Sequence, residues 1–128
     1  MATQKTRGEY LGQYAEGWTQ GDPDIIMRAC APSYQMVDPE YPLPIPLTRF
    51  VTYLANLKEA SEAAARSKGD PATQPFMELT EVVTQDDGHT LTAWCWWKIP
   101  GNGLEGSGLI KVTDQGVLSE KLAYYIEL

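Results

Sequence analysis

The sequence predicts an α+β domain in which three helices from the N-terminal half pack on the concave face of a curved antiparallel sheet. Apolar residues recur at helical spacing in the first half, whereas alternating β-branched and aromatic residues fill the second half. Three turn signals, DDGH, PGNG and TDQGV, separate the runs of the second half. Helices that precede a series of strands are typical of a sheet covered on one side. Because the 128 residues contain no repeat or linker, we expect a single domain over 1–128.

The first helix is predicted over residues 4–20, where the apolar positions at helical spacing are Tyr10, Leu11, Tyr14, Ala15 and Trp18. Asp22 then serves as the N-cap and Pro23 as the first residue of a short helix to about Ala31, and Pro32 ends that helix. A third helix is predicted from about 49 to 67. Thr48 caps it, and its apolar stripe consists of Phe50, Tyr53, Leu54 and Leu57.

Residues 33–38 alternate in the manner of a short strand, which places Tyr34, Met36 and Asp38 on one face. The segment PEYPLPIP (39–46) carries four prolines in eight residues, which predicts a stiff loop with little hydrogen-bonded structure. Four longer strands follow as an antiparallel meander, in the runs FMELTEVVT, TLTAWCWWKI, LEGSGLIKV and VLSEKLAYYIEL.

Charge and composition exclude several classes of partner. The 17 acidic and 10 basic residues give a net charge of −7, which repels nucleic acid and anionic membranes. No stretch approaches the roughly 20 apolar residues of a membrane-spanning helix, and the N-terminus lacks the apolar region of a signal peptide. Cys30 and Cys95 stand alone in apolar surroundings, which favours reduced core residues of a cytoplasmic protein, with a disulfide as the alternative.

Metal sites and histidine-dependent nucleophiles are disfavoured by count. The one histidine, His89, lies in a hairpin turn signal, and no CxxC motif is present. Neither GxxxxGK[ST] nor GxGxxG occurs, so the phosphate-binding loops of nucleotide sites are not indicated. We therefore expect no metal and no organic cofactor, and any chemistry falls to carboxylates and tyrosines.

Two features go beyond composition: a helix pair with the spacing Y-x7-D and an Asp-Pro after the first strand. They lie in QYAEGWTQGDPDIIMRACAPSYQMVDPE (13–40), and the pattern of the segment GLIKVTDQGVLSEKLAYY (108–125) supports the same resemblance. With these residues and this order of elements, the chain resembles the nuclear transport factor 2-like superfamily, whose fold is a cystatin-like α+β cone. Within it, the nearest resemblance is to Δ5-3-ketosteroid isomerases and SnoaL-like polyketide cyclases. That fold hosts enzymes and binding modules alike.

The resemblance implies a site with three positions. The tyrosine of the isomerases falls on Tyr14 and their general-base aspartate on Asp38, whereas the third position, a protonated acid, falls near Gly108. We expect Trp97 to fill the space over that glycine. Glu120, which pairs with Ile110 when counted through the DQG turn, is a candidate substitute acid. Each residue also has a plainer interpretation. Glu120 is then a solvated glutamate, Asp38 belongs to an Asp-Pro turn in water, and Tyr14 is a core residue.

The expected pocket is hydrophobic, aromatic-walled and closed by the prolines, and it takes a small hydrophobic ligand. Its residues besides Asp38 and Tyr14 are Trp18, Tyr34, Met36, Phe50, Tyr53, Trp97, Gly108, Glu120 and Tyr124. Strand alternation leaves Trp94 and Trp96 on the opposite, outer face of the sheet. Exposed aromatics are typical of interfaces, so we expect a homodimer through that face.

The expected chemistry is proton transfer on a small hydrophobic carbonyl compound, as in an isomerisation or an aldol-type cyclisation. Asp38 would remove the proton alpha to the carbonyl, and Tyr14 would donate a hydrogen bond to the oxygen. The sequence leaves open whether the chain is an enzyme. A non-catalytic ligand-binding module and an interaction domain with a packed cavity are the alternatives. Hydrolysis or dehydration is disfavoured, because no second acid near Asp38 is visible.

Overall fold

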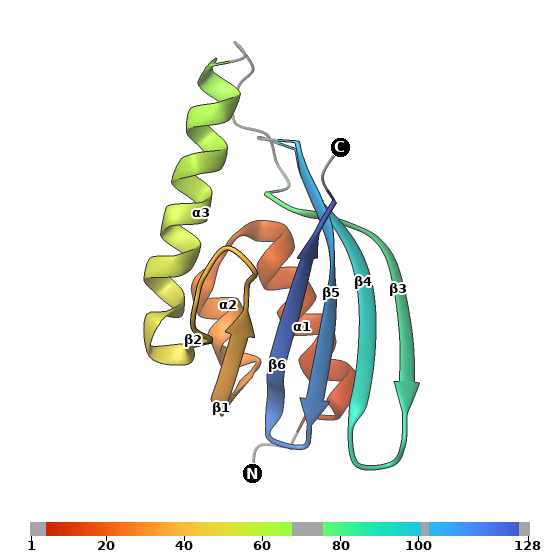
Figure 1. Ribbon diagram of the computed structural model, residues 1–128. Coiled ribbons are helices and arrows are strands. Elements are labelled where there is room, and N and C mark those ends of the chain that lie inside the picture. The colour runs from red at the N-terminus through yellow and green to blue at the C-terminus, as the bar shows by residue number, and fades with distance from the viewer. Residues whose placement is uncertain (1–4, 68–75, 101–102, 126–128) are drawn as a thin grey trace.

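The computed structural model describes residues 5–67, 76–100 and 103–125. Three helices, α1 (Arg7–Gln20), α2 (Pro23–Arg28) and α3 (Leu47–Ser67), lie in the N-terminal half. The strands are β1 (Cys30–Val37), β2 (Ile45–Pro46), β3 (Glu78–Asp86), β4 (Leu91–Ile99), β5 (Leu104–Thr113) and β6 (Gly116–Tyr124). Their order along the chain confirms the predicted α+β class (Figure 1).

The six strands form one sheet in the order β2-β1-β6-β5-β4-β3. Strands β3 to β6 make the predicted antiparallel meander. Strand β1, however, pairs with β6 in parallel, so the sheet is mixed and the expectation of a wholly antiparallel sheet is wrong in this respect. A parallel pair needs a long connection, and α3 with the first three strands of the meander supplies it.

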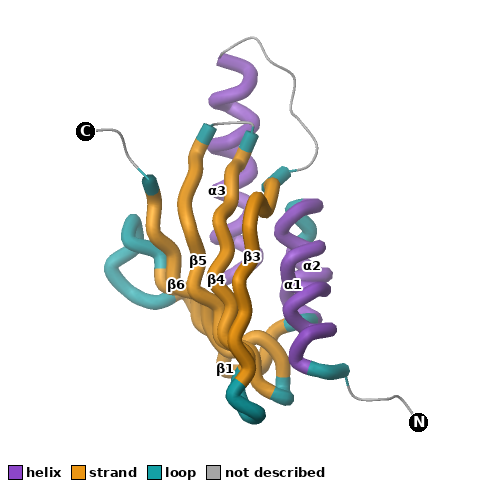
Figure 2. Tube along the Cα trace, turned by 90° about the vertical axis from the view of Figure 1, so that its right-hand side faces the viewer, coloured by secondary structure: helices purple, strands orange, loops and turns teal. Residues whose placement is uncertain are grey.

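The helices cover one side of the curved sheet. Figure 2 shows α1 and α2 beside each other on one side of the strand layer, and α1 contacts β3, β5 and β6. Helix α3 packs against β1, β2 and α2, where it buries Phe50, Tyr53 and Leu54. The concave side therefore lies between the sheet and all three helices.

The ends of the helices follow the local sequence. A capping box between Thr6 and Glu9 precedes α1, which begins at Arg7, three residues after the predicted beginning at residue 4. Asp22 caps α2 as predicted, with its side chain accepting from the backbone of Asp24. Helix α2 ends at Arg28 rather than near residue 31, because the chain already enters β1 at Cys30.

Two small departures concern the proline segment. Helix α3 begins at Leu47, one residue before the predicted cap Thr48. Ile45 and Pro46 form the two-residue strand β2, which pairs with Met36 and Gln35 of β1. The segment thus has hydrogen-bonded structure at its end, which the sequence did not predict.

The two faces of the sheet differ as strand alternation predicts. Along β4 the odd-numbered residues are buried, whereas Trp94 is 45% exposed on the outer face. Trp97 pairs with Gly106 and Cys95 with Gly108, which is the predicted register. The inner face of β4 and β5 therefore carries two glycines beneath larger side chains from neighbouring strands.

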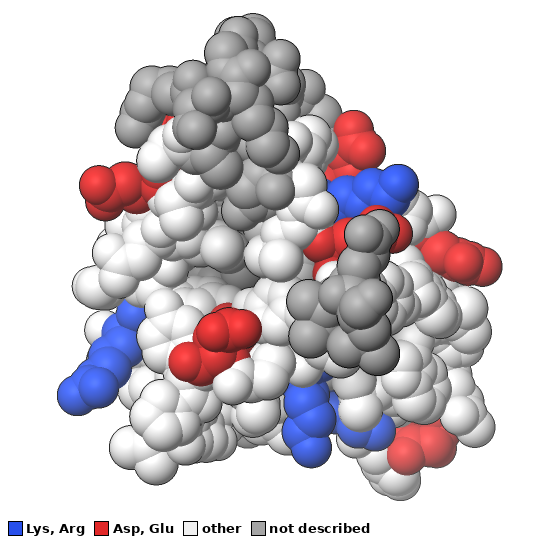
Figure 3. All heavy atoms as spheres, turned by 45° about the horizontal axis from the view of Figure 1, so that its top comes forward, with Lys and Arg blue, Asp and Glu red and all other residues white. Residues whose placement is uncertain are grey.

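The surface carries charges of both signs. On the face shown in Figure 3, charged side chains stand singly or in small groups among uncharged ones. Arg7 of α1 forms ion pairs with Asp86 and Asp114, which join the start of this helix to the ends of the β3 and β5 strands. None of the helices in the described part of the chain is long and apolar enough to cross a membrane.

Candidate active site

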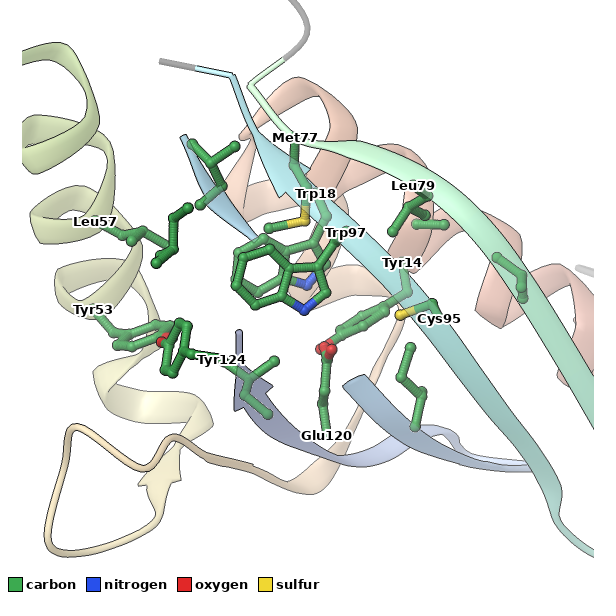
Figure 4. Close-up of a pocket in the computed structure, with 16 residues that line it drawn as sticks. Tyr14, Trp18, Tyr53, Leu57, Met77, Leu79, Cys95, Trp97, Glu120 and Tyr124 are labelled. Atoms are coloured by element: carbon green, nitrogen blue, oxygen red, sulfur yellow. The ribbon is translucent and has the colours of Figure 1, made fainter. Parts of the chain in front are cut away.

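A cavity of about 30 Å³ lies between the sheet and the helices (Figure 4). Its walls come from α1, α3, the four strands of the meander and Met77 just before β3. Most of the wall is apolar, including Leu57, Leu79, Ile99, Leu104, Ile110 and Leu122. A cavity needs about 10–15 Å³ to hold one water molecule, so this one has room for a water molecule or two. Binding of a larger organic molecule requires the walls to move apart.

Glu120 of β6 places a buried carboxyl group in this apolar wall; only 4% of its surface is exposed. The hydroxyl of Tyr14 donates a hydrogen bond to Glu120 Oε1 at 2.5 Å. The same hydroxyl lies 2.7 Å from that of Tyr34. A phenol has one proton to donate. Because Tyr14 gives its proton to the carboxyl group, Tyr34 donates to Tyr14, and the three side chains form one row of hydrogen bonds that ends on Glu120.

The buried environment of Tyr34, Tyr14 and Glu120 changes the pKa of each of these side chains. Burial raises the pKa of Glu120, whereas the hydrogen bond from Tyr14 lowers it, and the resulting pKa is about 7. Burial, followed by the proximity of Glu120, raises the pKa of Tyr14 and of Tyr34 well above the usual value for a phenol. Both phenols are therefore neutral donors near pH 7, whereas Glu120 exchanges between its two forms. A general base works best when its pKa lies near the operating pH.

The carboxyl group of Glu120 occupies the space over Gly108. A Cβ atom on Gly108 would collide with Oε2 of Glu120, whereas one on Gly106 would meet the ring of Trp97. The expectation that Trp97 fills the space over Gly108 is therefore wrong. Trp97 faces Gly106 directly in the register, and Glu120 reaches Gly108 diagonally from its own partner Ile110. Glu120 instead brings an acid to the position where the resemblance implies one.

Asp38 follows β1 and belongs to a second cluster. Its side chain is buried, with 3% of the residue exposed. Asp38 Oδ2 accepts hydrogen bonds from the hydroxyls of Tyr53 and Tyr124, each at 2.8 Å. Oδ1 accepts from the backbone N–H of Glu40 at 2.9 Å, which is the Asx turn expected of an Asp-Pro sequence. The carboxylate thus both starts a turn and is withdrawn from water.

The hydrogen bonds of Asp38 and Tyr14 go to different partners, so the predicted base and oxyanion donor belong to separate clusters. Tyr53 and Tyr124 connect the two. Together with Leu57 they line the inner cavity and also an outer pocket of about 390 Å³ that Asp38 borders. Burial, followed by the hydrogen bond to Asp38, raises the pKa of both phenols above the usual value. The two tyrosines therefore form a wall between the inner cavity and the outer pocket, and Asp38 holds both.

Six of the predicted site residues line the cavity, namely Tyr14, Trp18, Tyr53, Trp97, Glu120 and Tyr124. Tyr34, Met36 and Phe50 are buried in the core beside it, where Phe50 packs edge-to-face against Trp18 and Tyr34. Sequence reasoning missed the aliphatic wall. The sequence places Leu122 on the same face of its strand as Glu120 and Tyr124, and Met77 lies in the run FMELTEVVT with the parity of Leu79, so strand alternation is a signal for both.

The described residues include no group of three or more His, Cys, Asp or Glu side chains that could hold a metal ion. Cys30 and Cys95 are free thiols, and burial raises the pKa of each to about 12. Cys95 lies in the cavity wall. The ionisable chemistry of the cavity near neutral pH therefore centres on Glu120.

No protein-family model and no curated protein sequence matches this chain. Among solved structures, an NTF2-like protein of unknown function from Cytophaga hutchinsonii matches with a TM-score of 0.65 and 10% identity, over 98% of this chain and 95% of that one. A "putative polyketide cyclase" from Xanthomonas campestris matches with a TM-score of 0.63 and 17% identity, over 93% and 90%. A "putative ketosteroid isomerase" from Parabacteroides distasonis matches with a TM-score of 0.64 and 11% identity, over 95% and 89%. These matches confirm the predicted NTF2-like α+β cone.

Proposed function

We propose that this chain of NTF2-like fold catalyses proton transfer on a small, hydrophobic carbonyl compound, as in an isomerisation or an aldol-type cyclisation. The observation that carries the proposal is Glu120, a buried carboxyl group with a pKa of about 7 in the wall of an apolar cavity. The similarity in fold to a "putative polyketide cyclase" and a "putative ketosteroid isomerase" supports it.

In this proposal the ionised form of Glu120 removes a proton from the carbon alpha to the carbonyl group. The C–H bond breaks, and its electron pair passes into an enolate. The protonated Glu120 then returns the proton to another carbon atom of the same molecule, which completes an isomerisation without any co-reactant. Tyr14 holds the carboxyl group in place through its hydrogen bond and stabilises the ionised form before each cycle.

A second assignment keeps Asp38 as the base, as the resemblance implies. Asp38 borders the outer pocket of about 390 Å³, which has room for a small ligand without movement of the walls. Its Oδ2 atom already accepts hydrogen bonds from two phenols, which occupy the lone pairs of that oxygen. For this reason we place the proton transfer on Glu120 and give Asp38 the role of holding Tyr53 and Tyr124.

The test is the exchange of the α-hydrogens of 1-indanone in D₂O, followed by ¹H NMR, because this reaction needs only the first half of the cycle. We expect Glu120→Gln to lower the enzyme-catalysed exchange rate by about 100-fold or more, the range typical of a lost general base. Glu81→Gln, a matched change on the exposed strand β3, should leave the rate unchanged. Loss of exchange in Asp38→Asn but not in Glu120→Gln would move the base to Asp38.

A non-catalytic ligand-binding or interaction module is the second candidate function. The small volume of the cavity, about 30 Å³, favours the interaction module, because such a module needs no room for a ligand, whereas a ligand-binding module needs the walls to move apart. The same NMR experiment separates the two functions. Binding of 1-indanone to the wild-type protein without any exchange above the buffer rate would support a binding module and contradict the catalytic proposal.

We also propose a homodimer through the outer face of the sheet. Trp94 and Val83 are 45% and 52% exposed there and face each other across the β3–β4 pair. Burial of such a patch against a second copy would remove apolar surface from water. We expect the mass measured by light scattering to be that of a dimer, and Trp94→Glu to yield a monomer. Val51→Glu, at an exposed position on α3, is the control and should stay dimeric.

A cytoplasmic location completes the proposal. It is supported by the two free thiols, of which Cys95 is buried, because free thiols persist in reducing compartments. Recovery of the native protein from an extracellular fraction, or with Cys30 in a mixed disulfide, would contradict it.

A further inference from the structure

Two hydrogen-bond donors in the cavity wall have no acceptor among the described residues. They are the indole N–H groups of Trp18 and Trp97, whose Nε1 atoms are buried and unpaired. The residues are 5% and 2% exposed, and both line the cavity. Native proteins pair the great majority of their buried polar groups. Two unpaired donors in the wall of one small cavity therefore mark a place where an acceptor group of a ligand is favoured.

Both indole rings are held firmly. Trp18 packs against the rings of Tyr14 and Phe50, at centroid distances of 6.3 and 5.7 Å. Trp97 packs edge-to-face against Tyr124 at 5.6 Å. In the view of Figure 4, the nitrogen edges of both rings are turned toward the side of the cavity where Glu120 and Tyr14 lie. Donors fixed in this way need no reorganisation when charge develops on a bound oxygen.

The chemistry of the wall restricts the ligand. An indole can donate but cannot accept a hydrogen bond, so the ligand must present an acceptor. Among the described residues that line the cavity none is Lys, Arg or His, and the ionisable carboxyl group is that of Glu120. A carboxylate or phosphate ligand would find no countercharge and would be repelled by ionised Glu120. A neutral carbonyl oxygen attached to an apolar body fits these constraints.

From these observations we infer that Trp18 and Trp97 bind the carbonyl oxygen of the substrate and that the substrate is a neutral, hydrophobic ketone or enone. The inference rests on the proposed function and adds to it the substrate class and the groups that stabilise the enolate. When Glu120 takes the α-proton, the negative charge passes from its carboxylate to the carbonyl oxygen. The two indole N–H groups face that oxygen, so the total charge of the site stays constant during the step.

The experiment compares binding of 1-indanone with that of indane, which has the same ring system without the oxygen. Binding is followed through the ¹⁵N–¹H indole signals of the wild-type protein, Trp18→Phe and Trp97→Phe, since phenylalanine keeps an aromatic ring but removes the donor. We expect 1-indanone, but not indane, to shift the Trp18 and Trp97 signals strongly. Each substitution should weaken 1-indanone binding by about three- to tenfold, the usual range for one net hydrogen bond, and leave indane binding unchanged. Trp96→Phe on the outer face is the matched control.

Several outcomes would overturn the inference. One is equal weakening of both compounds in the Trp18 and Trp97 variants, which would indicate loss of packing alone. Another is the absence of any indole shift with 1-indanone up to its solubility limit. A third is tighter binding of indane-1-carboxylate than of 1-indanone at pH 8, which would contradict a neutral substrate. Because binding is measured without turnover, selective weakening of 1-indanone together with no α-hydrogen exchange would retain the carbonyl site and remove only the proposed catalysis.

Discussion

The carboxyl group of Glu120 fills the space directly over Gly108, so the missing side chain of one strand makes room for the acid of the next. Gly108 lies at the position where the resemblance to ketosteroid isomerases implies a protonated acid. The acid here arrives from β6 instead of β5, and it remains in the wall of the cavity. Glycine in a strand interior often marks a close approach of this kind. Gly108 and Glu120 therefore form one structural unit, in which the glycine is required by the acid.

Replacement of Gly108 by alanine should displace the carboxyl group without unfolding the protein. The new methyl group would collide with Oε2 of Glu120, which lies at the end of a flexible side chain and can turn away. We expect the α-hydrogen exchange of 1-indanone to fall by at least about tenfold, because a small misplacement of a catalytic group is costly. The exchange rate and the thermal midpoint should be measured on the same samples.

Gly12→Ala provides the matched control for this change. A Cβ atom on Gly12 of α1 would meet no atom within 4 Å apart from its chain neighbours and the backbone of its own helix, and alanine is favoured over glycine in a helix by about 1 kcal/mol. The variant should be equal or higher in stability and unchanged in exchange rate. Full exchange activity in Gly108→Ala would show that the position of Glu120 over Gly108 does not matter for the chemistry.

The raised pKa of Glu120 has a consequence for stability. Its pKa is about 7 in the folded protein, against an ordinary value of 4.5, so the folded state holds the proton more tightly than the unfolded state does. The contribution of Glu120 to the free energy of unfolding is therefore highest below about pH 4.5, falls as the pH rises toward 7, and levels off above it. The shift corresponds to about 3 kcal/mol.

Glu120→Gln should remove this dependence, because glutamine does not titrate. Relative to the wild-type protein, we expect the variant to gain about 3 kcal/mol in free energy of unfolding between pH 4.5 and pH 8. Urea unfolding at both pH values, with Glu81→Gln as the control, measures the difference. A constant difference between Glu120→Gln and the wild-type protein across this range would contradict the raised pKa.

The fold was predictable because periodicity is a local property of the sequence. Alternation assigned Trp94 to the outer face and Trp97 to the inner face, and the turn signals fixed the pairing of Trp97 with Gly106. The parallel placement of β1 beside β6 was missed. Neither strand carries a local signal for a partner about 80 residues away, and the wholly antiparallel expectation came from the meander alone.

The sequence identified residues of the candidate site but did not predict which of them form hydrogen bonds with one another. Tyr14, Asp38 and Glu120 were all identified, yet Tyr14 bonds to Glu120 and Asp38 bonds to two other tyrosines. Periodicity specifies the face on which a side chain lies, whereas a hydrogen bond depends on where that side chain ends. The choice between two buried carboxyl groups as partner of Tyr14 therefore required the tertiary structure.

Tyr14→Phe should shift the pH dependence of the exchange reaction. The hydrogen bond from Tyr14 lowers the pKa of Glu120, so its loss raises that pKa further. Exchange requires the ionised base, and its midpoint should move to a pH about one unit higher than in the wild-type protein. Tyr10→Phe, on the same helix but outside the cavity, is the control. A midpoint that stays in place would mean that Tyr14 does not bond to the ionised form of Glu120.

Asp38→Asn tests the wall between the inner cavity and the outer pocket. The amide keeps one oxygen to accept a hydrogen bond but carries no charge, so the hydroxyls of Tyr53 and Tyr124 lose their shared anionic acceptor. We expect the free energy of unfolding at pH 7 to fall by about 1–3 kcal/mol. Exchange should fall by less than tenfold if Glu120 is the base.

A double-mutant cycle that combines Asp38→Asn with Tyr124→Phe separates the loss of this hydrogen bond from general damage to the core. Because Asp38 and Tyr124 share one hydrogen bond, the double variant should be less destabilised than the sum of the single variants, by about 1 kcal/mol. Urea unfolding gives the four free energies, and NMR exchange on the same proteins gives the rates. Additive free energies, or an Asp38→Asn protein that is fully stable but inactive, would mean that Asp38 acts on the substrate and not on the tyrosine wall.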